Sequence, residues 1–181
     1  KKNFNSKMNK IISDNYLKLQ QKLHQNPNYG VAGIHFAPNV KKIVEDAKLS
    51  SISDYGAGKK SLQKILNELG LNNYQYYPYD PAFPEYGEAT EADLVCCIDV
   101  LEHAEEEFLD NILEDLKRIT KKFGFFTIHT GPAAKKLEDG RNAHLIQKPP
   151  SWWLPKMCSR FEIKHLQEIP SGFILITKCK K

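Results

Sequence analysis

The sequence predicts an α/β protein with a doubly wound, mainly parallel sheet, an antiparallel C-terminal edge and an N-terminal helical cap. Three observations support this prediction. Short segments of β-forming residues alternate with amphipathic helical segments from residue 51 to residue 129. The segment 92–98 is almost continuously apolar, which is typical of a strand buried on both faces. The last two β-rich segments are too close together for an intervening helix, so they should pair antiparallel.

The length favours a single domain. A chain of 181 residues has room for one sizeable core and little room for a second. We therefore expect residues 1–181 to form one domain, with N-terminal helices in residues 1–50 and a Rossmann-like core in residues 51–181.

Two helices are predicted before residue 50. The first follows from the helical spacing of Tyr16, Leu19 and Leu23, and it should end in the polar turn 25–28. The second should begin at Pro38, because proline is favoured in the first helical turn. Its apolar face comprises Val40, Ile43, Val44 and Ala47. These helices either cap a site or cover a face or an edge of the sheet.

The first half of the core reads as strand, glycine turn and helix. Residues 51–54 form a short strand that leads into the glycine turn 56–58. The following helix should end at Gly70. Its inward residues are predicted to be Leu62, Ile65, Leu66 and Leu69. Residues 74–79 and 92–98 then form two further strands.

The second half begins with an amphipathic helix. Glutamates 105–107 open this helix, and its basic end is predicted to comprise Lys117, Arg118, Lys121 and Lys122. Residues 123–129 form the next strand, and residues 149–160 form a loop and a short helix. The closing strands are 161–166 and 173–177, joined by the turn 170–172.

The composition excludes several classes of protein. Hydrophobic residues make up 41% of the chain and charged residues 27%, which excludes a disordered or collagen-like chain. No apolar run approaches the roughly 18 residues that span a bilayer, so a soluble cytoplasmic protein is expected. The four cysteines contain no C-x-x-C pair and the six histidines no metal-binding spacing, so no metal is assigned.

The net charge of +4 conceals a segregation of charge along the chain. Residues 1–50 carry nine lysines and three acidic residues, and residues 51–115 carry three lysines and fifteen acidic residues. Residues 116–181 carry fourteen basic and four acidic residues. Either these charges form an ordinary solvated surface, or the basic flanks bind a nucleic acid.

The candidate site follows from the sheet. Ligands of parallel sheets bind at the carboxyl ends of the strands, which here are residues 54–58, Asp80, 99–103 and 129–132. The turn 54–58, D-Y-G-A-G, lets a ligand approach main-chain N–H groups. It lacks the third glycine of the nicotinamide fingerprint and the spacing of the P-loop. Because a carboxylate at Asp80 can accept the hydroxyl hydrogens of a ribose, a nucleoside ligand without pyrophosphate fits best.

At these residues the sequence resembles the class I S-adenosylmethionine-dependent methyltransferases. The turn 54–58 is similar to the first motif of that family, and Asp80 is similar to its ribose-binding acid. Residues 92–103, A-D-L-V-C-C-I-D-V-L-E-H, resemble the fourth strand and following loop of its ubiquinone-biosynthesis-like members. The resemblance covers roughly residues 30–181. The chain departs from the family at Lys60, where many members have glycine, and in a short link after Asp80 that leaves little space for a third strand.

The resemblance implies S-adenosylmethionine as the cofactor. The N–H groups of 56–58 would bind its carboxylate, Asp54 its ammonium group and Asp80 its ribose, while residues 99–101 would line the adenine slot. Helix capping and solvent exposure are the alternative for Asp99 and Glu102, and packing is the alternative for the tyrosines. The residues expected to bind the cofactor are Asp54, Tyr55, Gly56, Ala57, Gly58, Tyr79, Asp80, Pro81, Asp99, Val100, Leu101 and His103.

The acceptor side is expected between residues 129 and 153. His144 and His129 are the candidate general bases, and His144 is preferred because its loop should reach over the substrate. Arg141, Trp152 and Trp153 are the candidate substrate-binding residues. Structural roles are the alternative for the histidines, and packing on the sheet is the alternative for the tryptophans.

The function expected from the resemblance is methyl transfer to an oxygen or nitrogen atom of a small molecule. RNA methylation is an alternative suggested by the basic flanks, although the sequence lacks a K-D-K-E arrangement and an asparagine-proline motif. A noncatalytic S-adenosylmethionine-binding protein that acts through a partner is a third possibility. No membrane partner is expected, and the oligomeric state stays open.

Overall fold

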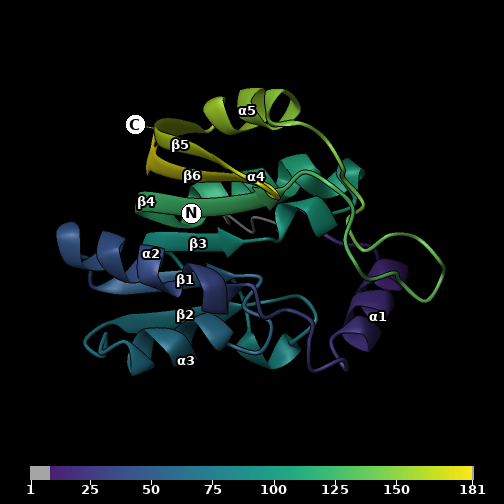
Figure 1. The fold of residues 1–181 in the computed structure, drawn as a ribbon, viewed down its shortest axis with the longest axis horizontal. Coiled ribbons are helices and arrows are strands. Elements are labelled where there is room, and N and C mark those ends of the chain that lie inside the picture. Colours follow the sequence, from purple (N-terminus) through teal and green to yellow (C-terminus); the bar gives the residue numbers. More distant parts are fainter. Residues whose placement is uncertain (1–8, 181) are drawn as a thin grey trace, which may run out of the picture.

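One six-stranded sheet organises residues 9–180, which are the residues that the computed structural model describes (Figure 1). Residues 1–8, the start of the predicted N-terminal region, lie outside this range, as does Lys181. The elements in chain order are α1 (Asp14–Leu23), α2 (Gly33–Asp46), β1 (Ser51–Tyr55), α3 (Ser61–Glu68), β2 (Gln75–Tyr79), the 3-10 turn η1 (Pro84–Tyr86), β3 (Ala92–Ile98), the 3-10 turns η2 (Leu101–His103) and η3 (Glu106–Phe108), α4 (Leu109–Ile119), β4 (Thr120–His129), α5 (Pro150–Cys158), β5 (Phe161–Ile169) and β6 (Gly172–Cys179).

The strand order β2-β1-β3-β4-β6-β5 confirms the predicted fold class. Strand β1 pairs in parallel with β2 and β3, and β3 pairs in parallel with β4. Strand β6 then pairs antiparallel with both β4 and β5. The sheet is therefore parallel except at its C-terminal edge, and its edge strands are β2 and β5.

Strand β3 shows why the segment 92–98 is continuously apolar. All seven of its residues are buried, and successive side chains point to opposite faces. Leu94 and Cys96 pack with α2 and α3, whereas Val95 and Cys97 pack with α4 and α5. Each face of the sheet thus has its own apolar core, as Figure 1 shows by the helices on either side.

The second predicted helix begins earlier than expected. Helix α2 starts at Gly33, so Pro38 lies inside it instead of at its first turn. A Cβ atom at Gly33 would lie 2.9 Å from the Cβ of Leu62, which shows how closely the start of α2 approaches α3. Phe36 and Ala37 are buried in the core, and this burial offsets the hydrogen bond that Pro38 cannot donate.

Two further details differ from the prediction. Leu69 is 41% exposed and lies just beyond the end of α3 at Glu68, so it does not belong to the inward face of the helix. Lys121 and Lys122 belong to β4 and not to a helix end. The ammonium group of Lys121 lies 2.9 Å from Glu91, and that of Lys122 lies 3.2 Å from Asp93. These ion pairs join the N-terminal ends of the neighbouring parallel strands β3 and β4.

The N-terminal helices fulfil both of the roles considered for them. Helix α2 packs on one face of the sheet, whereas α1 lies beyond the carboxyl ends of the parallel strands (Figure 1). None of the described helices is long and apolar enough to cross a bilayer.

Candidate functional site

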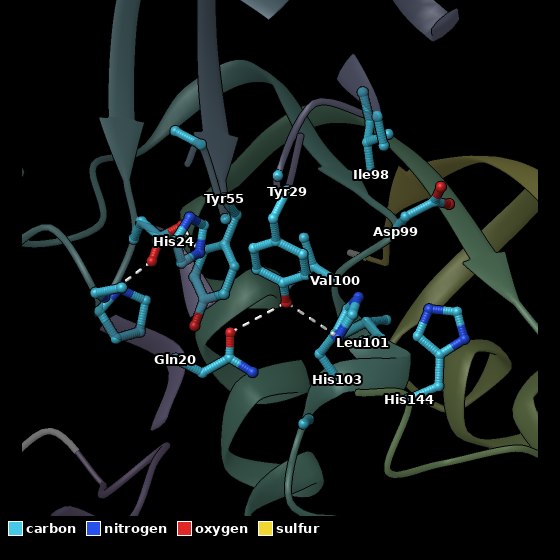
Figure 2. A pocket seen from close by; sticks show the side chains of 18 of the residues that line it. Gln20, His24, Tyr29, Tyr55, Ile98, Asp99, Val100, Leu101, His103 and His144 are labelled. Carbon is cyan, nitrogen blue, oxygen red and sulfur yellow. Dashed lines mark hydrogen bonds and ion pairs between the residues drawn. The ribbon is translucent and has the colours of Figure 1, made fainter. Parts of the chain in front are cut away.

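A cavity of about 470 Å³ opens at the carboxyl ends of the strands and is bounded on one side by α1. Figure 2 shows side chains from both the N-terminal segment and the strand ends pointing into it. Its volume lies within the range of small-molecule and cofactor sites. Of the residues expected from the sequence, those that line it are Asp54, Tyr55, Gly56, Ala57, Asp80, Pro81, Asp99, Val100, Leu101, His103, His129 and His144.

The glycine turn between β1 and α3 is tied to the end of β2. The N–H groups of Gly56 and Ala57 both donate to the carbonyl oxygen of Tyr79, at 2.7 and 2.9 Å, and that of Gly58 donates to Asp80 Oδ2 at 2.9 Å. The expectation that these three groups bind a ligand carboxylate is therefore wrong, because the protein already uses them. Their role is to fix the position of Asp80 relative to the turn.

Gly56 is required by its surroundings. Its φ is +84°, which L side chains rarely adopt, and a Cβ atom there would lie 2.4 Å from Cγ2 of Val100. The turn and the loop after β3 therefore touch at this point, and both line the cavity.

The two acidic residues at the ends of β1 and β2 have different environments. Asp54 is buried, the hydroxyl of Tyr76 donates to it, and burial raises the pKa of its carboxyl to about 7. Asp80 accepts the N–H groups of Gly58 and Ala82 on separate oxygens, at 2.9 and 2.8 Å. Each oxygen of Asp80 keeps a further lone pair, so this carboxylate is oriented and can still accept a hydrogen bond from a ligand.

Three histidines line the other end of the cavity, and the buried Glu102 lies next to them. The ring centroid of His144 lies 4.7 Å from those of both His103 and His129. Glu102 is fully buried, which excludes the solvent-exposed alternative for this residue. Its Oε1 accepts the N–H of His129 at 3.0 Å. Burial raises the pKa of Glu102 well above its usual range, and the nearby Asp99 has the same effect.

The imidazoles of His103 and His144 are held by main-chain carbonyl groups. Nδ1 of His103 lies 2.7 Å from the carbonyl oxygen of Ala143, and Nδ1 of His144 lies 2.8 Å from that of Gly131. Burial lowers the pKa of His103 to about 3 and also lowers the pKa of His144. Both rings are therefore neutral near pH 7.

The sequence predicts an N-terminal helical cap but not the contacts that hold it over the cavity. Ser13 donates its N–H and its hydroxyl to Glu105, at 2.7 and 2.6 Å, and Tyr16 donates its hydroxyl to the carbonyl of His103 at 2.5 Å. Figure 2 shows the hydroxyl of Tyr29 between Gln20 and His103. The helical spacing in the sequence predicts α1 but carries no signal for these contacts, which join residues far apart in the chain.

Five of the predicted site residues do not line the cavity. Gly58 bonds to Asp80, and Tyr79 packs behind the cavity wall with its ring 4.7 Å from that of Tyr55. Arg141 pairs with Asp139 at the protein surface. Trp153 is fully buried in the core between α5 and the sheet.

Trp152 packs against that same core and is only partly buried. The expectation that Trp152 and Trp153 line an acceptor pocket is therefore wrong. Helix α5 directs these apolar residues toward the sheet, as the packing alternative predicts.

Solved structures share this architecture. A Burkholderia thailandensis 1,6-didemethyltoxoflavin-N1-methyltransferase, solved with 1,6-didemethyltoxoflavin and S-adenosylhomocysteine bound, has a TM-score of 0.63, with 12% identity over 96% of this chain and 93% of that one. The chain has the class I methyltransferase fold. The magnesium protoporphyrin IX methyltransferase of Synechocystis PCC 6803, solved with S-adenosylmethionine bound, matches with a TM-score of 0.57 and 12% identity over 95% of this chain and all of that one.

A mitomycin 7-O-methyltransferase also has this class I methyltransferase fold, with a TM-score of 0.58 and 16% identity. The match covers 90% of this chain and 60% of that enzyme. No family model and no curated protein sequence matches the chain. In this version of the fold the link between β2 and β3 contains only the turn η1, as the short link in the sequence predicts.

Proposed function

We propose that this protein transfers a methyl group from S-adenosylmethionine to a small-molecule acceptor. The observation that carries the proposal is that Asp54 and Asp80 line one cavity beside the glycine turn, at the strand ends of a class I methyltransferase fold. Three similar structures are of methyltransferases, and two of them were solved with this cofactor or its demethylated product bound.

The residues at the strand ends fit this cofactor. Asp80 is oriented by two main-chain N–H groups and retains the lone pairs that two ribose hydroxyls require. Asp54 is a buried carboxyl whose pKa is raised, so a cationic ligand group beside it would favour its charged form. The ammonium group of the cofactor is such a cation. The chemistry that S-adenosylmethionine supplies when bound is an electrophilic methyl group on a sulfonium.

The protein's own contribution is alignment and exclusion of water. Methyl transfer proceeds by in-line displacement, for which a fixed geometry of donor and acceptor supplies much of the rate enhancement. Helix α1 and the segment around Tyr29 close the cavity through the contacts of Tyr16 and Ser13 with the loop after β3. His144 and His129 line the acceptor end, where we propose that His129 accepts the proton of the acceptor and that His144 promotes its loss.

The test is calorimetry with S-adenosylhomocysteine and the full chain. Asp80→Ala should weaken binding by about 10- to 100-fold, because a charged acceptor of two hydroxyl hydrogen bonds is lost. Glu85→Ala, which removes an exposed acidic side chain from η1, is the matched control and should leave the affinity unchanged. No binding of S-adenosylhomocysteine to the unaltered protein would overturn the proposal.

Turnover separates the enzyme from its noncatalytic alternative. The protein is incubated with isotopically labelled S-adenosylmethionine and a set of hydroxyl- and amine-bearing metabolites, and products are detected by mass. Label in a small molecule supports the proposal. Binding without transfer to any acceptor would favour a noncatalytic cofactor-binding protein, and transfer only to RNA would favour the nucleic-acid alternative.

A further inference from the structure

Three potential metal ligands converge beside the cavity, which two of them, His103 and His144, line. Glu102 and His103 belong to η2, and His144 belongs to the loop between β4 and α5. One ligand atom of each side chain lies within 4.8 Å of the others. The sequence offered no metal-binding spacing for these residues, because the third lies in a distant segment that only the fold brings to η2.

The tautomers of both histidines suit metal binding. A carbonyl oxygen only accepts hydrogen bonds, so the Nδ1 atoms that face Ala143 and Gly131 carry the ring protons. The Nε2 atoms of His103 and His144 consequently carry lone pairs. Metal-binding histidines are usually held in this way, with the second ring nitrogen donating to a carbonyl or carboxylate.

Glu102 adds a buried carboxylate to these two lone pairs. Its Oε1 accepts the N–H of His129, whereas its Oε2 is buried and has no hydrogen-bond partner among the described residues. Buried polar atoms are rarely left without a partner, since the cost of desolvation is then uncompensated. A proton on Glu102, which its raised pKa favours, would satisfy only one of the two imidazole lone pairs, whereas a single cation would accept an electron pair from all three side chains.

We propose that Glu102, His103 and His144 bind one divalent transition-metal ion. Two nitrogen ligands and one carboxylate favour ions such as Zn²⁺ or Mn²⁺ over Mg²⁺ and Ca²⁺, which prefer oxygen ligands. Bonds of about 2.0 to 2.2 Å to a single ion place two ligand atoms at most about 4.4 Å apart, and the ligand atoms here lie within 4.8 Å of one another, so at most a small shift of the side chains is needed. Three protein ligands leave at least one coordination position for another group.

The open position has a consequence for the acceptor, and this part of the inference rests on the proposed function. His103 and His144 both line the cavity, so an ion between them is within reach of a bound small molecule. A hydroxyl oxygen that coordinates the ion has a lowered pKa. Its O–H bond then breaks with the electron pair kept on oxygen and the proton released to water. The inferred acceptor is therefore a hydroxyl-bearing small molecule, and His144 holds the ion instead of acting as the base.

The experiment measures metal binding directly. The full, untagged chain is freed of metal with a chelator and titrated separately with Zn²⁺, Mn²⁺ and Mg²⁺ in a calorimeter. We expect one equivalent of Zn²⁺ or Mn²⁺ to bind, and Mg²⁺ to bind more weakly. Glu102→Gln and His144→Gln should each reduce the affinity by more than about 100-fold, because each removes a ligand. His165→Gln, on the exposed strand β5, is the matched control and should bind like the unaltered protein.

Several outcomes would overturn the metal site. These are the absence of stoichiometric binding to the unaltered protein, tightest binding of Mg²⁺, and an affinity that is equal in Glu102→Gln and His165→Gln. Should Glu102→Gln fail to fold, as judged by circular dichroism, X-ray absorption of the unaltered protein with Mn²⁺ replaces it. Nitrogen ligands around the ion support the site, and an oxygen-only shell refutes it.

The metal titration tests the metal site whether or not the proposed function holds. Stoichiometric metal binding without binding of S-adenosylhomocysteine would sustain the site and refute the methyltransferase. Conversely, the protein could bind no metal and still transfer methyl groups at a rate that a chelator does not reduce. That result would refute the metal site and support the methyltransferase.

Discussion

Asp54 links the charge of the cavity to the stability of the protein. Its carboxyl is buried at the end of β1, and burial raises its pKa to about 7 from an ordinary value of 3.8. Between these two pH values the folded chain retains a proton that the unfolded chain has released. The contribution of Asp54 to the free energy of unfolding is therefore complete below about pH 4 and is lost as the pH rises through about 7.

Replacement of this residue should flatten part of the pH dependence of stability. From pH 4 to pH 7, we expect the free energy of unfolding of the unaltered protein to fall relative to that of Asp54→Asn, by on the order of a few kcal/mol. Urea denaturation at a series of pH values measures this difference. Asp46→Asn, at the exposed end of α2, is the control. Parallel pH profiles for the unaltered protein and Asp54→Asn would contradict the assignment.

At the level of elements, the turn between β1 and α3 requires Gly56 for two reasons, its positive φ and the lack of space for a Cβ atom, and each can be tested separately. Gly70 has nearly the same φ, +86° against +84°, but a Cβ atom there would meet nothing within 4 Å. Gly70→Ala thus measures the backbone strain alone, which we expect to cost about 1 to 2 kcal/mol. Gly56→Ala should cost more, because its Cβ atom also overlaps Val100.

A double variant identifies the overlap. Adding Val100→Ala to Gly56→Ala removes the methyl groups that approach the new Cβ atom, so we expect it to recover part of the lost stability. Thermal or urea unfolding of the two single variants and the double variant provides the measurement. Strictly additive losses would show that the loop after β3 does not constrain the turn.

Helix α5 contains two adjacent tryptophans with different burial. Trp153 is fully buried, whereas Trp152 is partly buried and lies 4.6 Å below the ammonium of Lys156. Trp153→Ala should lower the free energy of unfolding by about 3 to 5 kcal/mol, as expected for the loss of a large core side chain. Trp152→Ala should cost about 1 kcal/mol or less. Equal losses in urea denaturation would contradict the packing described for α5.

Local patterns in the sequence were sufficient for most elements and insufficient for the contacts between them. The apolar run 92–98 predicts β3 because burial on both faces leaves no room for polar residues. The predicted start of α2 at Pro38 is wrong, because burial of the preceding residues outweighed the preference of proline for the first helical turn. The positions of the strand ends predict that Asp80 lies near the glycine turn, but its hydrogen bond with Gly58 and the approach of Glu102 to His144 depend on how the strands are ordered and are not predicted by the sequence.

Across the whole molecule, charges that are segregated along the sequence come together in space. Lys121 and Lys122, from the basic third of the chain, pair with Glu91 and Asp93 from the acidic middle. Lys22 of α1 pairs with Glu138, one of the few acidic residues of that basic third. These three lysines thus form ion pairs with nearby acidic residues, as expected for an ordinary solvated surface.

Long-range hydrogen bonds also attach the cap helix, α1, to the core. Glu105→Ala removes both hydrogen bonds from Ser13, so α1 should open more often. If the proposed function holds, S-adenosylhomocysteine should dissociate several-fold faster, while the free energy of unfolding changes by no more than about 1 kcal/mol. Stopped-flow dissociation and hydrogen exchange of the α1 amides test this expectation. Glu106→Ala, an exposed neighbour, is the control, and unchanged exchange in Glu105→Ala would refute the attachment.

The edge strand β2 bears on how the protein behaves at high concentration. Gln75 donates its N–H to Ser50, and because successive residues of a strand alternate in direction, Pro78 sits where its missing N–H would face outward. An incoming strand from another molecule would find one donor fewer along this edge. The opposite edge, β5, carries Glu162, Lys164 and Glu168. Both ends of the sheet thus oppose intermolecular strand addition, one by proline and the other by charge, and this protects the chain against aggregation.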